Sequence, residues 1–190
     1  MQKNILWTGI EYHSLENCLI TFTNKGAEIT SSIIGAYADK LYKVDYRIST
    51  NHLWQTISFE IKTRLNNLIE TISFQSDGAG NWNADAKSME LFNGCIDIDI
   101  SLTPFTNTLP INRLKLAEGQ SEKIKVLYID TLNQQTRPVY QLYTRLSQTE
   151  YKYQNVPNDF ESIITVDESG LVVKYPDLFE RSMIQVSDYR

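Results

Sequence analysis

The feature that most constrains the fold of this sequence is a repeated two-residue alternation of apolar and polar side chains. Residues 41–49, LYKVDYRIS, place tyrosine, valine and isoleucine at every second position and charged residues between them. Successive side chains of a strand point to opposite faces, so this period is typical of strands with one buried face. The same alternation recurs in residues 54–62, 68–76, 123–130, 139–148 and 162–173. The sequence therefore predicts an all-β protein.

Turn residues separate these segments, and helical patterns are few. The short connections favour mostly antiparallel strands, curled towards a barrel so that few edges stay unpaired. PINRLKL after Thr108 and PDLFERS after Tyr175 each predict a short helix, because proline is tolerated at the start of a helix.

The length of 190 residues fits a single domain over residues 1–190. The two halves also resemble each other, since residues 70–82 and 161–171 share a strand followed by an Asp- and Gly-containing turn. An internal duplication over about 35–105 and 115–190 would explain this similarity. Chance similarity between hairpins is the alternative.

Charge and composition exclude several classes of partner. The net charge is −5 and the basic residues are scattered, which argues against nucleic acid and against anionic membrane surfaces. No apolar run is long enough to span a membrane, so we expect no stable membrane insertion. The first residues lack a signal-peptide pattern, so we expect a cytoplasmic protein, with Cys18 and Cys95 as buried free thiols.

Asp97 and Asp99 are the most conspicuous candidates for chemistry, because residues i and i+2 of a strand point the same way. A catalytic carboxylate pair, an oxygen-only cation site and a structural clasp are the alternatives. Catalytic pairs flank the reacting bond, which neighbours on one strand face do not readily do. We therefore expect this face to contact Arg113 or another arginine, and residues 106–114 to fold over that end of the barrel.

No sequence motif supports a metal, a cofactor or a nucleophile. Only two histidines are present, and neither lies in a zinc motif. Phosphate-loop, dinucleotide and G-x-S-x-G patterns are absent, so we expect no metal site, no cofactor and no catalytic residue.

A polar row along one later strand predicts a ligand-binding surface. Gln141, Tyr143 and Arg145 share a face and are suited to hydrogen bonds with a sugar or a headgroup. An ordinary outward-facing polar row is the alternative. Tyr153 follows after a short turn, and its ring and those of Trp54 and Trp82 are candidates to line an acyl tail.

Four motifs resemble the bacterial family described as putative glycolipid-binding, formerly a domain of unknown function. They are DGAGNW (77–82), LFNGCIDIDISLTPFTNTLPINRL (91–114), YQLYTRL (140–146) and VDESGLVVKYPDLFER (166–181), in this order from about residue 35 onward. The family pattern falls on Trp82, Gly94, Cys95, Asp97, Asp99, Thr103, Pro104, Asn107, Thr108, Leu109, Pro110, Arg113, Gln141, Tyr143, Tyr175 and Pro176.

The resemblance implies a flattened, split β-barrel similar to periplasmic lipoprotein carriers. It also implies a non-enzymatic binder or carrier of a glycolipid or another amphipathic small molecule, held in the barrel cavity. Asp97, Asp99, Asn107, Thr108 and Arg113 would then be structural residues at the cavity rim. Two alternatives stay open: a hydrolase that uses Asp97 or Asp99, and a protein-interaction module without a small ligand. The sequence does not specify an oligomeric state.

Overall fold

The computed structural model describes residues 1–188 as a mostly β fold with one short helix. Helix α1 is Thr108–Leu114, preceded by 3₁₀ turns at Glu90–Phe92 and Phe105–Asn107. The strands are β1 Gln2–Gly9, β2 Ser14–Phe22, β3 Ala27–Tyr37, β4 Lys40–Thr50, β5 Thr56–Leu65, β6 Leu68–Ser76, β7 Trp82–Ala84, β8 Lys87–Ser88, β9 Asp97–Ile100, β10 Ser121–Asp130, β11 Gln135–Arg145, β12 Glu150–Val156, β13 Glu161–Val166, β14 Val172–Tyr175 and β15 Phe179–Ser187. The predicted all-β class is confirmed.

All strands belong to one open sheet in the order β8-β7-β6-β5-β4-β3-β2-β1-β15-β14-β13-β12-β11-β10-β9. Neighbours pair antiparallel, except for β9 and β10, which run parallel. The first and last strands, β1 and β15, pair with each other in the middle of the sheet. The two free edges are therefore formed by strands from the middle of the chain, β8 and β9.

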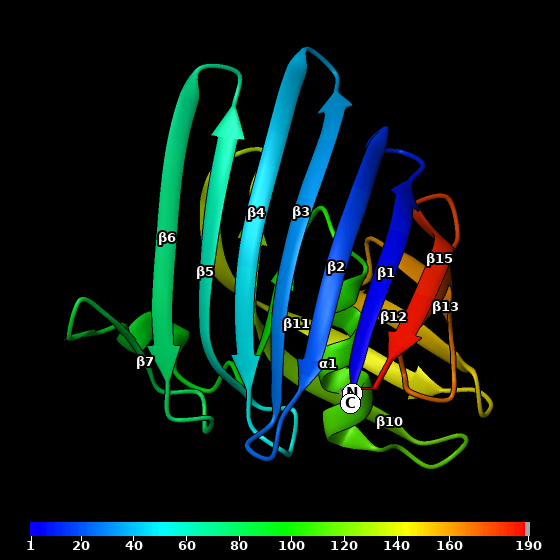
Figure 1. Cartoon of the computed structure of the whole chain (residues 1–190). Coiled ribbons are helices and arrows are strands. Elements are labelled where there is room, and N and C mark those ends of the chain that lie inside the picture. The colour runs from blue at the N-terminus through cyan, green and yellow to red at the C-terminus, as the bar shows by residue number, and fades with distance from the viewer. Residues whose placement is uncertain (189–190) are drawn as a thin grey trace.

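The sheet curls so that its two halves face each other. In Figure 1 strands β1–β6 form the front wall, while β10, β11 and β12 pass behind and below it. Two clusters of buried side chains fill the space between the halves, one centred on the β1–β5 wall and one on β10–β14. This arrangement agrees with the expected mostly antiparallel, split barrel.

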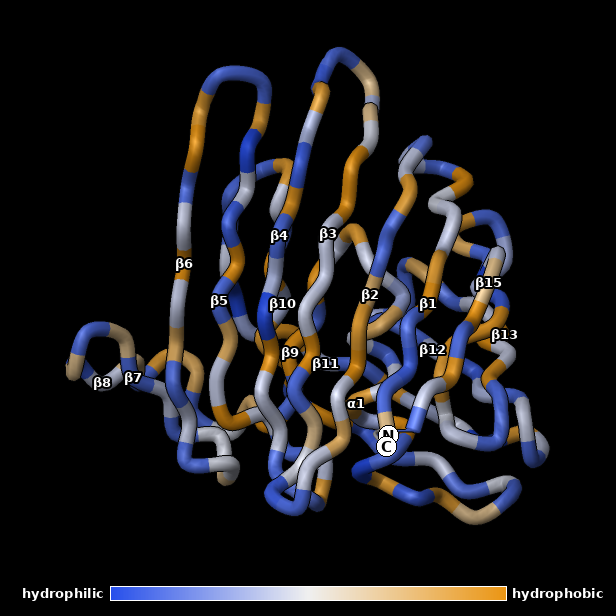
Figure 2. Tube along the Cα trace, in the orientation of Figure 1, coloured by the Kyte–Doolittle hydropathy of each residue, from blue (hydrophilic) through white to orange (hydrophobic). Residues whose placement is uncertain are grey.

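The alternation in the sequence corresponds to burial in the sheet. In β4 the side chains of Tyr42, Val44, Tyr46 and Ile48 are each at most 2% exposed. The intervening positions are exposed or partly exposed, and Figure 2 shows the same change of hydropathy along the strands. A side-chain period of two therefore fixed the buried face correctly.

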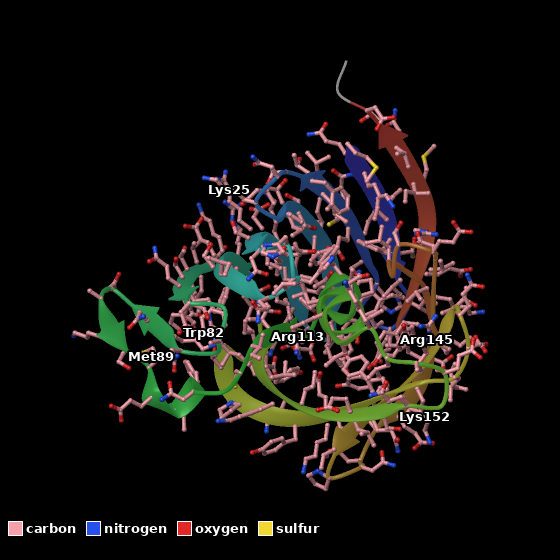
Figure 3. The ribbon with its side chains drawn as sticks, turned by 90° about the horizontal axis from the view of Figure 1, so that it is seen from below. Lys25, Trp82, Met89, Arg113, Arg145 and Lys152 are labelled. Carbon is pink, nitrogen blue, oxygen red and sulfur yellow. The ribbon has the colours of Figure 1, made fainter. Side chains whose placement is uncertain are left out.

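The interior of the curled sheet is occupied by the chain itself. Residues 102–111, which include the second 3₁₀ turn and most of α1, are all buried. Seen from below in Figure 3, α1 lies between the two halves of the sheet. The helix ends where Lys115 takes a left-handed conformation, with φ of 48°. The segment predicted to cover one end of the barrel therefore packs inside it.

Two local expectations fail at turns. The predicted helix after Tyr175 is wrong: Asp177 has a φ of +64°, Leu178 N–H donates to Tyr175 O, and β15 begins at Phe179. The alternation predicted through Trp54 also breaks, because Trp54 has a φ of +63° and a bulge follows between β4 and β5. Turn conformations of this kind change which side chains point to the buried face, so a regular two-residue pattern does not continue across them.

Other expectations concern cysteines and membrane-spanning helices. Cys18 and Cys95 are buried free thiols, as predicted. Among residues 1–188, no helix has the length and apolar character needed to cross a bilayer.

Candidate functional site

A cavity of about 400 Å³ opens between the second half of the sheet and the turn that joins β1 to β2. This volume lies within the range of roughly 300–1,000 Å³ typical of small-molecule sites. The lining residues come from six separate parts of the chain: Glu11, Tyr12, Asp99, Ile100, Ser101, Thr103, Asn107, Tyr128, Arg137, Val139, Tyr140, Gln141, Tyr153, Asn155, Val156, Pro157, Asp159, Phe160, Tyr175, Leu178 and Phe179. We call this the aromatic pocket.

One wall of the aromatic pocket is a row that crosses three strands. Asp99 on β9 pairs in register with Tyr128 on β10, and Tyr128 pairs with Arg137 on β11. The Arg137 guanidinium lies over the Tyr128 ring, 5.5 Å from its centroid. Val139 and Gln141 continue this face along β11 because they stand two and four residues after Arg137.

The opposite wall consists of aromatic rings in mutual contact. Tyr153 lies 6.2 Å from Tyr175 between ring centroids, Tyr175 lies 6.3 Å from Phe179, and Phe179 lies 5.8 Å from Tyr12. Phe160 contacts both Tyr153 and Tyr175 near the opening. Such contacts hold the rings in fixed positions, so the wall is preorganised.

Asp99 lies in this pocket and is held by two neutral donors. Thr106 Oγ1 donates to one carboxylate oxygen at 3.1 Å, and Gln141 Nε2 donates to the other at 2.6 Å. Burial raises the pKa of Asp99, and these two hydrogen bonds partly counteract it. Among the residues that the structure describes, no lysine or arginine forms an ion pair with Asp99.

Asp97, two residues earlier, has a different environment. It is fully buried and accepts hydrogen bonds from Arg113 on α1, from Nε at 3.0 and 3.1 Å and from Nη2 at 2.6 Å. The predicted contact of this face with Arg113 is thus present. Burial raises the pKa of Asp97, against the opposing effect of the Arg113 hydrogen bonds and charge. Asp97 does not line the aromatic pocket.

Gln141, Tyr143 and Arg145, the row predicted to bind a headgroup, have three different environments. Gln141 is buried in the pocket wall and holds Asp99. Tyr143 is buried beside it, and its hydroxyl donates to Asn107 Oδ1 at 2.9 Å. Arg145 donates to the backbone oxygens of Leu116 and Ser147, away from the pocket.

Only some of the remaining predicted residues line the pocket. Tyr153 and Asn107 line it, whereas Thr108 is buried next to Asn107 within α1. Trp82 packs in the core and its indole N–H donates to Cys95 O at 2.7 Å. Trp54 contacts Phe22 in a turn. Figure 3 shows Trp82 and Arg145 on opposite sides of Arg113, so the predicted set does not form one site.

Sequence reasoning missed most of the aromatic wall. Tyr12 comes from a turn with no distinctive pattern, Phe160 lies in the loop directly before β13, and Phe179 is the first residue of β15. Tyr175 carried one signal, because the family resemblance falls on it. Tyr128 lies within the apolar run of β10, and the sequence pattern identified this residue only as part of a strand. The fold brings these residues together through long-range pairing that a local pattern does not encode.

A buried carboxylate lies behind the pocket. Glu16 on β2 is 2% exposed, and its Oε1 accepts hydrogen bonds from Tyr46 at 2.6 Å, Ser31 at 2.7 Å and the pocket residue Thr103 at 2.9 Å. Its Oε2 has no partner within residues 1–188. Burial raises the pKa of Glu16 to about 7, although the three hydrogen bonds lower it.

A second hollow lies on the outer face of β2–β5 and has a volume of about 520 Å³. Half of its ten lining residues are exposed polar or charged side chains, namely Asn17, Thr30, Arg47, Glu60 and Lys62. Tyr46 is the one aromatic ring among its described lining residues, whereas several rings in mutual contact line the aromatic pocket, which is therefore the stronger candidate site. Within the described residues, no three His, Cys, Asp or Glu side chains are grouped to hold a metal ion.

Comparisons with known proteins agree with one another. Residues 4–181 match the profile of a family described as putative glycolipid-binding. The crystal structure of a DUF1089 family protein from Pseudomonas aeruginosa superposes with a TM-score of 0.80 at 33% sequence identity, and the match covers 87% of this chain and 91% of that one. No curated protein matches the chain. The profile match includes the N-terminal strands, where the sequence motifs alone were less distinctive.

Proposed function

This chain belongs to the putative glycolipid-binding family, and from that premise we propose that it is a non-enzymatic protein that binds a glycolipid or another amphipathic ligand by its headgroup in the aromatic pocket. The observation that carries the proposal is the composition of that pocket. Rings in contact form one wall, and the amide of Gln141, the hydroxyl of Thr103 and the carboxylate of Asp99 line the same hollow. An aromatic-lined hollow with a small number of convergent polar groups is typical of ligand sites.

The volume supports a headgroup rather than a whole lipid as the buried part. A hollow of about 400 Å³ is at the lower end of small-ligand sites. The barrel interior holds residues 102–111 instead of a tail. An acyl chain would leave through the opening, where Phe160 is 37% exposed and Leu178 is partly exposed. Carriage of the ligand between membranes or proteins is part of the same proposal.

The arrangement of carboxylates favours binding over the hydrolase alternative. A glycosidase needs two carboxyl groups on either side of the scissile bond. Asp97 is ion-paired to Arg113 and lies outside the pocket lining, so Asp97 and Asp99, the pair suggested by the sequence, do not face one site.

Binding of an alkyl glycoside below its critical micelle concentration tests the proposal. We expect saturable binding by isothermal titration calorimetry, with the Gln141→Ala variant at least tenfold weaker because the buried amide donor is lost. Gln75→Ala changes the same residue type on the exposed face of β6, away from the pocket, and should bind like the parent protein. Absence of saturable binding to alkyl glycosides with neutral and amino sugars alike would refute the proposal.

A further inference from the structure

The charge inside the aromatic pocket is unbalanced. Asp99 lies in the wall, Glu11 and Asp159 lie at the opening, and Arg137 is the one basic side chain among the described lining residues. Arg137 is exposed and its guanidinium lies over the Tyr128 ring. The lining therefore carries more acidic than basic groups, which disfavours an anionic ligand group.

The contrast between two neighbouring aspartates identifies where the imbalance is greatest. Asp97 receives a full counter-charge from Arg113. Asp99, on the same strand and the same side, receives hydrogen bonds within residues 1–188 only from the neutral groups of Thr106 and Gln141. Asp99 is partly buried, and a partly buried carboxylate with neutral donors keeps an uncompensated charge that a bound cation would compensate.

Tyrosines surround this carboxylate. The pKa values of Tyr128, Tyr153 and Tyr175 are raised first by burial and next by the negative charge of Asp99. The three rings line the pocket together with Phe160 and Phe179. Aromatic faces carry negative charge density and attract cations, and ammonium groups are recognised by such clusters.

We propose, as a refinement that rests on the proposed function, that the ligand headgroup carries a positively charged amine, which binds beside Asp99 among the pocket tyrosines. An amino sugar and an ethanolamine headgroup both supply this chemistry. An ammonium N–H donates to a free lone pair of the Asp99 carboxylate, and the rings exclude water around it. A neutral sugar satisfies the same lone pairs with hydroxyl groups but leaves the charge in place.

Probes that differ only at the amine test this inference. Octyl glucoside, octyl glucosaminide and its N-acetyl derivative share one tail and one ring, and calorimetry would measure the binding of each to the full chain. We expect the free amine to bind about tenfold more tightly than the two neutral probes. Equal affinities for the three would overturn the inference while leaving headgroup binding intact. Absence of binding by all three would overturn the proposed function as well.

A pair of variants locates the effect. Asp99→Asn removes the charge at nearly constant shape and should reduce the amine preference to less than threefold. Glu122→Gln makes the same charge change at an exposed position of β10 outside the pocket lining and should retain the preference. A preference that survives in Asp99→Asn would contradict the assignment. If Asp99→Asn does not fold, the comparison of the three probes in the parent protein still decides the question.

A lysophosphatidylethanolamine probe distinguishes the two sources of the amine. Binding tighter than that of octyl glucosaminide would assign the headgroup to a phospholipid, and weaker binding would assign it to an amino sugar. The lysophosphatidylglycerol analogue lacks the amine and should bind at least tenfold more weakly than the ethanolamine probe. Equal binding of these two phospholipids would contradict amine recognition.

Discussion

Arg113 on α1 holds the fully buried carboxylate of Asp97 on β9 through both Nε and Nη2. The two residues stand 16 positions apart, and the pair joins the helix inside the curled sheet to the strand at its edge. Parallel donation to a carboxylate is the strongest geometry available to arginine. The contact therefore fixes the segment that fills the barrel.

Arg113→Met should destabilise the protein by about 3 kcal/mol, because it leaves the Asp97 carboxylate buried without a counter-charge. Chemical denaturation followed by tryptophan fluorescence would measure the loss. Lys43→Met, which breaks the exposed Lys43–Asp45 pair, is the control and should cost less than about 1 kcal/mol. The double variant Asp97→Asn/Arg113→Met should be more stable than Arg113→Met alone, and equal losses in all three proteins would count against a buried clasp.

Glu16 should make stability depend on pH between about 4.5 and 7. Its pKa rises from 4.5 to about 7 in the folded state, so the native protein binds more protons and its stability falls as pH increases through this window. Relative to Glu16→Gln, the free energy of unfolding should decrease on the order of 2–3 kcal/mol between pH 5 and pH 8.

Urea denaturation at both pH values, with parent and variant measured side by side, would test this expectation. The difference between the two proteins isolates Glu16 from the other buried carboxylates. Parallel pH profiles for the two proteins would show that Glu16 keeps an ordinary pKa.

Gly80→Ala should be far more damaging than Gly119→Ala. Both glycines have positive φ, +89° and +79°, so both variants carry a backbone penalty of about 1–2 kcal/mol. A Cβ at Gly80 would lie 3.0 Å from the backbone of Gly94, whereas one at Gly119 meets nothing within 4 Å. We expect a total loss of about 3 kcal/mol or more for Gly80→Ala by thermal unfolding. Similar losses in both variants would mean that the backbone near Gly94 shifts freely.

Trp82→Phe should destabilise the protein by about 2–3 kcal/mol, because Cys95 O loses its indole donor and the core loses volume. Trp54→Phe keeps the edge contact with Phe22 and should cost less than about 1 kcal/mol. Neither tryptophan lines the aromatic pocket, so calorimetry should give parent-like affinity for octyl glucoside in both. Loss of binding in either variant would indicate that the substituted tryptophan contributes to the ligand site after all.

The sequence predicted what depends on local pattern. The buried face of β4 followed from its two-residue period, and the predicted contact of the Asp97/Asp99 face with Arg113 or another arginine is made by Arg113 to Asp97. The burial of residues 102–111 between the sheet halves did not follow, because the apolar side chains there are compatible with covering a barrel or filling it.

The aromatic pocket depends on pairings between distant strands. Tyr12 meets Phe179 because β1 pairs with β15, and no local pattern connects residues so far apart. Gln141 lies in the pocket wall, and its predicted part in ligand binding stays a prediction, while Tyr143 and Arg145 on the same face bind the protein itself. The internal duplication stays a prediction.

The pairing of β1 with β15 has a consequence for biosynthesis. The ribosome makes these strands at opposite ends of the described chain, yet they are adjacent in the middle of the sheet (Figure 1). Each arm of the sheet is able to form hairpins while translation proceeds, but the seam between the arms closes only after β15 emerges. Until then β1 presents an unpaired edge, and a nascent chain would be most open to chaperones and to mispairing with its neighbours at that edge.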